Sequence, residues 1–403
     1  MISLNATKEA LGLDKIPERW EAFAPTLEKD TSFFERESLL AFFEEYPLFP
    51  VHAEMLLSAA EKVLKNQALT DYLLLLTRAM YDWALIQEDI AALTLPRPRG
   101  EEERLPYDML ALLACLPHIP PVYALLRARG VSEKILADSF AVIDTMVPPP
   151  PAEKAFDAGN LSWVQHYLHG INLRIGCLFF HRIDDMYKSS FGIYRSSKGE
   201  FRLLAEKGTY HLNGHLAAEK DTPEESDFEA VLLETESYYE AFLISEAGLV
   251  SPTTVRLAKN EWTRVAGPES PAITIHIPSG PGLTPENVRA SLREALDFHR
   301  RIFPECKAQF FHCHSWLLDT QHRQFLAPGS NILGFQDCFI HGNTTTYDNC
   351  VFTFLFRCGK DNLEDLPENS SMQRKIKQHL LAGNHIYEQN GIIPFEWVEN
   401  NTL

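Results

Sequence analysis

Four consecutive prolines at positions 148–151 constrain the fold of this chain more than any other feature of its sequence. Proline fixes φ and lacks a backbone N–H, so this run cannot lie inside a helix or a central strand. The spacing of apolar residues also changes across it, from a period of 3.6 residues to a period of about 2. We therefore predict a helical N-terminal domain at residues 1–150 and a second domain at residues 151–403.

The first domain carries apolar stripes at the three- and four-residue spacing of amphipathic helices. One stripe covers residues 51–64 and includes Val51. A second stripe begins after Thr70, which we interpret as its N-cap, and continues to residue 90. Further helices are predicted at about residues 31–45, 106–116, 119–129 and 132–146, and one more, at about residues 159–168, follows the four prolines.

After Gly170 the apolar stretches are short and rich in aromatic and β-branched residues, and turn sequences separate them. This pattern predicts an antiparallel sheet built of hairpins, and an α+β fold class for the whole chain. The expected strands lie at residues 173–180, 191–195, 201–204, 210–212, 231–233, 238–244, 308–318 and 350–357. A last helix is expected from residue 370 or 371 to residue 381.

The clearest local unit lies at residues 273–303. A strand leads through a turn that contains Gly282 into a helix whose predicted N-cap is Thr284. Such a unit directs free backbone N–H groups and the helix dipole at one point, where an anion can bind. Pro278 and Pro281 remove two donors from the turn, and a turn that only connects the two elements has the same pattern.

Histidines on the predicted strands are candidates for proton transfer. His276 alternates with apolar neighbours, so it is either a general base or a structural histidine. His312 and His314 point to one face of their strand, with Cys313 on the other. The pair is either hydrogen-bonded inside the sheet, or active in proton transfer, or a metal-binding pair for which Asp319 is the only nearby acid. We interpret Cys313 as a core residue.

Polar residues near the C-terminus allow two interpretations each. Arg374, Lys375 and Lys377 form the densest basic cluster, which suits either a phosphate or a solvated helix face. Asn331 and Gln336 are candidates for contact with a polar substrate.

Composition excludes several classes of partner. The net charge of −18 and the lack of any basic face argue against nucleic acids and anionic membranes, which require concentrated Lys and Arg. Residues 109–126 carry no formal charge, but three prolines interrupt them, so we predict two buried helix ends that meet at a turn. Nothing in the sequence points to a particular oligomeric state.

Seven cysteines at irregular spacings predict reduced thiols, with no disulfide and no structural zinc. Residues 1–9 lack the basic and apolar regions of a signal peptide. These observations together lead us to expect a cytoplasmic protein.

Several stretches together resemble a bacterial family usually labelled acyltransferase-domain proteins. This family joins a helical N-acyltransferase N-terminal domain to a GNAT-like C-terminal domain. The stretches that carry the resemblance are residues 275–286, 290–292, 313–319, 330–336, 366–373 and 381–383, with residues 130–138 further back. The resemblance is strongest over about residues 270–385.

The resemblance implies an acyl-CoA-dependent N-acyltransferase that acts on a small-molecule amine or hydroxyl, with acetyl-CoA or another acyl-CoA as co-substrate. His276 would be the base and His314 the second proton carrier, and no metal is implied. The acyl-CoA pyrophosphate would be held by backbone N–H groups of Ser279, Gly280, Gly282, Leu283, Thr284 and Asn287. The turn lacks the Gln/Arg residue with which the usual GNAT motif begins. The alternative hypothesis is therefore a non-catalytic ligand-binding protein on a GNAT-like scaffold. A metal enzyme that uses its paired histidines is the weaker alternative.

Overall fold

The computed structural model describes residues 2–81, 93–100, 102–147, 156, 158–186, 189–218, 227–278, 282–359 and 362–403. Contacts within the chain divide it into two compact units, Met1–Arg174 and Ile175–Leu403. The four prolines at 148–151 lie outside the described residues, as do Ser279 and Gly280.

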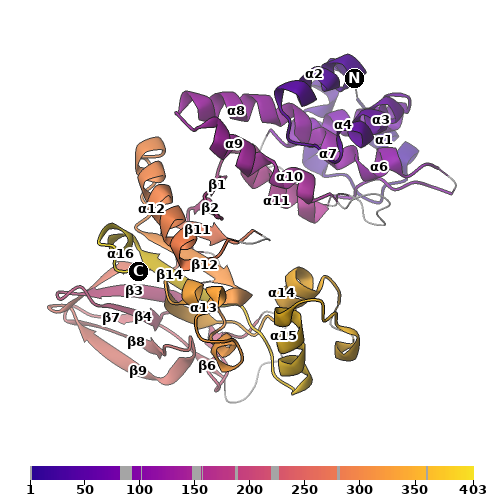
Figure 1. The fold of residues 1–403 in the computed structure, drawn as a ribbon. Helices are drawn as coiled ribbons and strands as arrows, with labels where there is room; N and C mark the ends of the chain where they lie inside the picture. Colours follow the sequence, from indigo (N-terminus) through magenta and orange to yellow (C-terminus); the bar gives the residue numbers. More distant parts are fainter. Residues whose placement is uncertain are drawn as a thin grey trace. The chain divides into compact units, whose positions relative to one another are not determined.

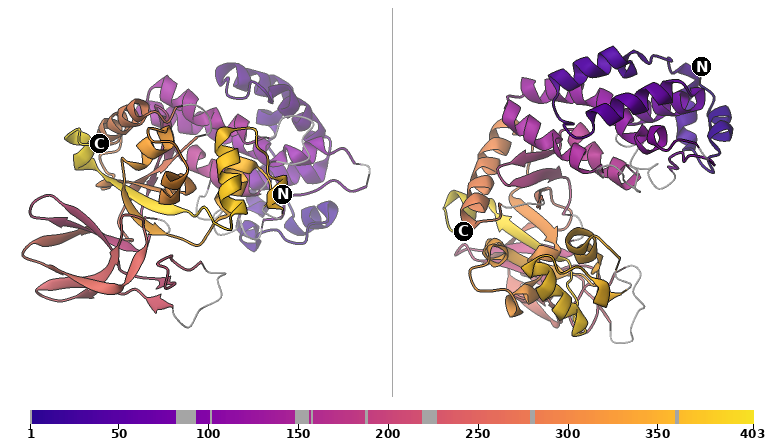
Figure 2. Two further views of the ribbon diagram at one scale, coloured as in Figure 1. Left: turned by 60° about the horizontal axis from the view of Figure 1, so that its bottom comes forward. Right: turned by 45° about the vertical axis from the view of Figure 1, so that its right-hand side comes forward.

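The first unit is helical, as predicted (Figures 1 and 2). Its described residues form no strand before β1 (Asn172–Ile175), which begins at the end of the unit. The helices are α1 (Leu4–Leu11), α2 (Arg36–Glu45), α3 (Ala53–Leu64), α4 (Gln67–Ala79), α6 (Leu105–Asp108), α7 (Leu110–Cys115), α8 (Ile119–Ala128), α9 (Glu133–Phe140), α10 (Val142–Thr145) and α11 (Ala158–Leu168).

The uncharged stretch forms two helices, α7 and α8, whose buried ends meet at a turn, as predicted. A single 3₁₀ turn (Leu116–His118) joins α7 to α8, and Pro117 lies in its first positions, where a missing N–H breaks no helical bond. Among the described residues, Leu110–Ala128 is the one run that is long and apolar enough to cross a membrane. Burial of 67% of its most apolar window inside the protein is also what a core helix shows.

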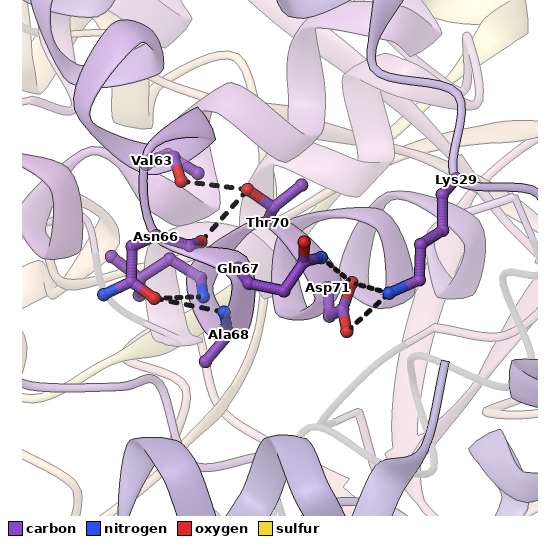
Figure 3. A network of polar contacts seen from close by, with 8 residues as sticks. Lys29, Val63, Asn66, Gln67, Ala68, Thr70 and Asp71 are labelled. Atoms are coloured by element: carbon purple, nitrogen blue, oxygen red, sulfur yellow. Dashed lines mark hydrogen bonds and ion pairs between the residues drawn. The ribbon is translucent and has the colours of Figure 1, made fainter. Parts of the chain in front are cut away.

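The N-cap of α4 is Asn66, not Thr70. Asn66 Oδ1 accepts hydrogen bonds from the N–H groups of Ala68 and Leu69, at 3.1 and 3.2 Å. Thr70 lies inside the first turn of the helix, and its hydroxyl donates to the Val63 carbonyl at 2.9 Å (Figure 3). The helix therefore starts four residues earlier than predicted, because the short side chain of Asn66 accepts bonds that apolar periodicity does not reveal.

The helix predicted at residues 51–64 also begins later than predicted. Val51 is 62% exposed, and α3 starts only at Ala53.

Asn66→Ala is expected to lower the free energy of unfolding of the helical unit by about 1 kcal/mol, because it removes the acceptor for two N–H groups. Urea titration followed by circular dichroism measures this change. Asn66→Ser retains a capping oxygen and is the control. Equal stability of Asn66→Ala and the unmodified protein would contradict the assignment of the cap.

The second unit contains most of the sheet structure (Figure 1). The first sheet has the strand order β1-β2-β11-β12-β14-β13, and the second has the order β10-β3-β4-β8-β7, with β9 on β8. The remaining strands are β2 (Leu178–Ile183), β3 (Phe191–Ser196), β4 (Phe201–Ala205), β5 (Thr209–Tyr210), β6 (Phe228–Glu229), β7 (Leu233–Glu234), β8 (Tyr238–Ile244), β9 (Val250–Ala258), β10 (Trp262–Ala266), β11 (Ala272–His276), β12 (Phe310–Ser315), β13 (Ile340–Thr344) and β14 (Gln389–Pro394). Antiparallel pairs dominate, which confirms the predicted class.

Several predicted strands differ from the structure. The strand expected at 173–180 is split into β1 and β2 by a turn at Gly176, whose φ of 61° favours glycine. Residues 350–356 are helical, in α14 (Asn349–Val351) and a π-helical turn (Phe352–Phe356), because a short apolar run does not distinguish a strand from a buried helix. Strands β6, β9, β10, β13 and β14 were not predicted from the sequence.

The helix of the 273–303 unit agrees closely with its prediction. Helix α12 (Pro285–Ile302) begins after Thr284, whose hydroxyl accepts from the Asn287 N–H at 3.3 Å. Its buried side includes Leu292, Leu296, His299 and Ile302. The other C-terminal helices are α13 (Asn331–Gln336), α15 (Ser371–Leu381) and α16 (Phe395–Glu399).

Helix α12 packs on one face of the first sheet (Figure 1). The Phe180 ring of β2 lies 5.4 Å from the Phe311 ring and 6.3 Å from the His299 ring, measured between centroids. Ile273 and Ile275 are registered with Phe311 and Phe180 respectively, so they share this apolar face. The opposite face carries the alternate residues of the same strands.

Candidate active site

Strands β11 and β12 run parallel, whereas β11 is antiparallel to β2 and β12 is antiparallel to β14. The parallel register pairs Ile273 with Phe311 and Thr274 with His312, and it ends there. Two residues further along each strand, His276 and His314 therefore occupy the same face of neighbouring strands, beyond the last registered pair. The two histidines that the sequence singled out come from the ends of two adjacent strands.

A buried chain of hydrogen bonds crosses this face behind them. The Thr274 hydroxyl lies 3.2 Å from His312 Nδ1, and His312 Nε2 lies 2.9 Å from Asn390 Oδ1. The Asn390 amide donates to Asn343 Oδ1 at 3.2 Å. His312, Asn390 and Asn343 are fully buried. Because burial lowers the pKa of His312 to about 4, its ring is neutral and structural.

His276 has a second histidine as its neighbour. His276 Nε2 lies 3.3 Å from Nδ1 of His181, which projects from β2. His181 is buried, whereas His276 is half-buried at the end of β11. Ile275, on the opposite face, is 1% exposed, as the alternation of the strand predicts. The contact allows one ring to donate to the other and so to orient it.

His314 faces an acid that the sequence analysis did not find. His314 Nδ1 lies 3.6 Å from Glu388 Oε2, and both side chains are 8% exposed. The thiol of Cys350, on α14, donates to Glu388 Oε1 at 2.8 Å. Asn390, on β14, is registered directly with His314, so Glu388, two residues earlier, extends toward the same face.

The turn that follows β11 is described from Gly282 onward. A Cβ at Gly282 would lie 3.3 Å from the Cβ of Cys177, so the backbone passes close to its neighbour there. Leu283 and Thr284 are half-buried, and the Asn287 N–H is already engaged by the Thr284 hydroxyl. Among the predicted donors in the described part of the turn, the N–H groups of Gly282, Leu283 and Thr284 have no hydrogen-bond partner among the described residues.

Gln336 and Asp319 belong to the supports of the site rather than to its reacting groups. The buried Gln336 amide donates to the carbonyl oxygens of Leu317 and Asp319 at 2.9 Å each. Asp319 accepts from the N–H groups of Gln321 and Tyr387, at 2.9 and 2.8 Å. Desolvation nevertheless raises its pKa to about 6.

Two residues of the basic cluster on α15 bind groups of nearby loops, whereas Arg374 is exposed and donates to the Glu368 carbonyl at 2.7 Å. Lys377 is buried, and its ammonium donates to the carbonyl oxygens of Glu364 and Leu366 and to the Glu368 carboxylate. Lys375 donates to the Phe325 carbonyl at 2.9 Å. These cations stabilise loops, because loop carbonyls need donors when they are buried.

The cysteines are all free thiols. Cys313 is buried, as predicted, and burial raises the pKa of its thiol far above the ordinary value. Cys115 and Cys338 are also buried, whereas Cys358 is exposed.

The described residues hold no group of three or more His, Cys, Asp or Glu side chains arranged for a metal ion. His312, one half of the His-x-His pair, uses both ring nitrogens in hydrogen bonds. Its geometry therefore favours the hydrogen-bonded interpretation over the metal-binding one.

Local sequence patterns gave no indication of His181 or Glu388. Both join the site through strand pairing, β2 with β11 and β14 with β12. The strand predicted at residues 173–180 ends one residue before His181. Glu388 precedes Gln389 and Asn390, a polar run that does not resemble a strand.

Comparison with solved structures defines the class of fold. An acyltransferase in complex with CoA and 10C-teicoplanin matches with a TM-score of 0.63 at 18% identity, over 97% of this chain and 99% of its own. An acyltransferase mutant in complex with octanoyl-CoA matches with a TM-score of 0.63 at 17% identity, over 97% and 98%. An acyltransferase in complex with decanoyl-CoA and teicoplanin gives 0.61 at 18%, over 97% and 99%. The chain thus has the fold of these acyltransferases along nearly its whole length.

The model of the GNAT-like C-terminal domain family matches residues 173–393. The chain belongs to this family, as the resemblance implied. No curated protein matches its sequence.

The free energy of unfolding is expected to depend on the ionisation of Asp319. The folded-state pKa of about 6 lies above the ordinary value of 3.8, so the stabilising contribution is complete below pH 3.8 and is lost as the pH rises through 6. The loss is on the order of 3 kcal/mol. Asp319→Asn removes this titration, and urea titrations from pH 4 to 8 measure the difference between the two proteins. Parallel stability curves would contradict the assignment.

Proposed function

We propose that this protein transfers an acyl group from acyl-CoA to an amine or hydroxyl of a small molecule. Support comes from its family and from its fold, which it shares with acyltransferases solved with CoA, octanoyl-CoA and decanoyl-CoA. The single observation that carries the proposal is the placement of His276 and His314 on one face, where β11 and β12 stop pairing. Two of the matching structures also hold teicoplanin or a derivative, so a large acceptor is compatible with this fold.

An acyl-CoA would supply an activated thioester and an anionic pyrophosphate. The residues at the turn fit such a group in one respect, since the N–H groups of Gly282, Leu283 and Glu286 have no hydrogen-bond partner among the described residues. They lie at the positive end of the 18-residue helix α12. Gly282 also lets the backbone approach a ligand closely.

His276 is the proposed general base. Its ring would take the proton from the amine or hydroxyl of the acceptor, so that the nucleophile attacks the thioester carbonyl. His181 would hold the ring of His276 in one orientation through the contact at 3.3 Å. His181 thus acts as a positioning residue.

His314 is the proposed second proton carrier. The carbon–sulfur bond breaks as the new carbon–nitrogen or carbon–oxygen bond is completed, and the departing thiolate needs a proton. Glu388, whose Oε2 lies 3.6 Å from His314 Nδ1, would orient the imidazole in this role. The proton taken from the acceptor is thereby balanced by the proton given to the thiol.

His276→Gln is expected to lower kcat by about 10²- to 10⁴-fold while acyl-CoA binding is retained, because the variant keeps a polar group and loses the base. Release of free thiol from acetyl-CoA, octanoyl-CoA or decanoyl-CoA in the presence of candidate amines measures turnover. His379→Gln, at a half-buried histidine of α15, is the control. Full activity of His276→Gln would contradict the assignment, and acyl-CoA binding without turnover by the unmodified protein would favour the non-catalytic alternative.

Gly282→Val is expected to abolish binding of acyl-CoA, because its side chain would block the turn and crowd Cys177. For the unmodified protein, acyl-CoA at a hundredfold excess over Kd should stabilise the fold by about 2.7 kcal/mol, and thermal unfolding with and without the ligand measures this. Gly329→Val is the control, since Gly329 has a φ of 80° at a turn where an added Cβ meets nothing within 4 Å. Normal stabilisation of Gly282→Val by acyl-CoA would place the cofactor site elsewhere.

A further inference from the structure

The segment 345–350 contacts Glu388 through both its backbone and a side chain. The Thr345 N–H donates to the Glu388 carbonyl at 2.9 Å, and the Glu388 N–H donates to the Tyr347 carbonyl at 3.1 Å. Further along the segment, on α14, the Cys350 thiol donates to Glu388 Oε1 at 2.8 Å. The acyl transfer proposed above uses Glu388 but gives no role to Cys350.

The backbone bonds fix the main chain of residue 388 and leave its side chain to be placed. Both the N–H and the carbonyl of Glu388 are bonded to the segment 345–350. The terminal torsion of a glutamate side chain is broad, so a carboxylate is not oriented by its own rotamer preference. The bond from Cys350 ends on one of the two carboxylate oxygens and therefore restrains this torsion.

The distance from Glu388 to His314 makes that orientation important. Oε2 lies 3.6 Å from His314 Nδ1, which is longer than the roughly 2.7–3.2 Å of an N–H···O hydrogen bond. Hydrogen bonds in active sites are often long without substrate and shorten in the complex. With Oε1 bonded to the thiol, Oε2 is the oxygen that faces the imidazole. A rotation of the carboxylate away from Cys350 would also turn Oε2 away from His314.

The chemistry of the contact favours a hydrogen-bond donor over a nucleophile. A thiol is a weak donor to neutral groups, but an ionised acceptor strengthens the bond. A thiolate in the same place would be repelled by the carboxylate at 2.8 Å. Cys350 thus contributes to the site as a protonated thiol.

We propose that Cys350 is a positioning residue of the acyl-transfer site, whose thiol holds the Glu388 carboxylate in the orientation in which Oε2 faces His314. The proposal rests on the proposed function, because Cys350 acts through the proposed proton carrier. No bond of Cys350 is made or broken in the reaction. It adds α14 to the strands that build the site.

The first test is kinetic. Cys350→Ala removes the donor and should lower kcat by about 10- to 100-fold, with the KM for acyl-CoA unchanged because the turn at Gly282 is intact. Cys350→Ser keeps a donor and should recover most of the loss. Cys306→Ala, at another half-buried thiol of this unit, is the matched control and should have the kcat of the unmodified protein. Full kcat in Cys350→Ala, or no recovery in Cys350→Ser, would overturn the proposal.

A double-mutant cycle separates positioning from a general structural role. If the thiol acts through the carboxylate, Cys350→Ala should cause no further loss of kcat in a Glu388→Ala background. A thiol that only packs within α14 would lower kcat by the same factor in both backgrounds. Such additive losses would contradict the proposed role of Cys350.

The third test does not require turnover. In protein with ¹³C-labelled histidine, the NMR signal of His314 is assigned by its loss in His314→Gln. Cys350→Ala should shift this signal by more than its line width, Cys350→Ser should shift it less, and Cys306→Ala should leave it in place. An unmoved signal in Cys350→Ala would overturn the proposal even in an active enzyme. A shifted signal in a protein that turns over no acyl-CoA would support the positioning role and count against the proposed function.

Discussion

The parallel contact between β11 and β12 is the constraint on which the arrangement of the second unit depends. It is flanked on both sides by antiparallel pairs, and helix α12 connects its two strands and covers their apolar face. On the other face, the neutral His312 links Thr274 to Asn390 across three strands. A buried polar group that loses its partner is costly, so this chain holds the strands in a single register. Beyond the Thr274–His312 pair, the ends of β11 and β12 lie next to each other without pairing.

Features that depend on neighbours in sequence were predictable. The strand, turn and helix around Thr284 followed from local alternation, a capping hydroxyl and proline at the first helical position. The cap of α4 shows the limit of such arguments, because Asn66 and Thr70 both suit an N-cap and only the fold decides between them. Hydrogen bonding to Val63 draws Thr70 into the helix.

The residues around the proposed reaction site come together through long-range strand pairing, so fewer of them could be predicted from the sequence. His276 and His314 were found because each lies on a strand with a readable period. Their neighbours His181 and Glu388 come from strands that approach only in the folded sheet. The helical state of residues 350–356, which brings Cys350 to Glu388, is likewise set by packing rather than by local preference. Tertiary contact therefore supplied about half of the side chains around the proposed reaction.

The distribution of the cysteines has a consequence for the handling of the protein. The buried thiols of Cys115 and Cys313 are held protonated and shielded, so neither oxidants nor alkylating reagents reach them readily. Cys358 is the exposed thiol. Oxidation during storage should therefore begin by linking two chains through this position, and a maleimide dye should attach there first. Cys358 is thus the first position for covalent dimer formation and for labelling, ahead of the half-buried Cys177, Cys306 and Cys350.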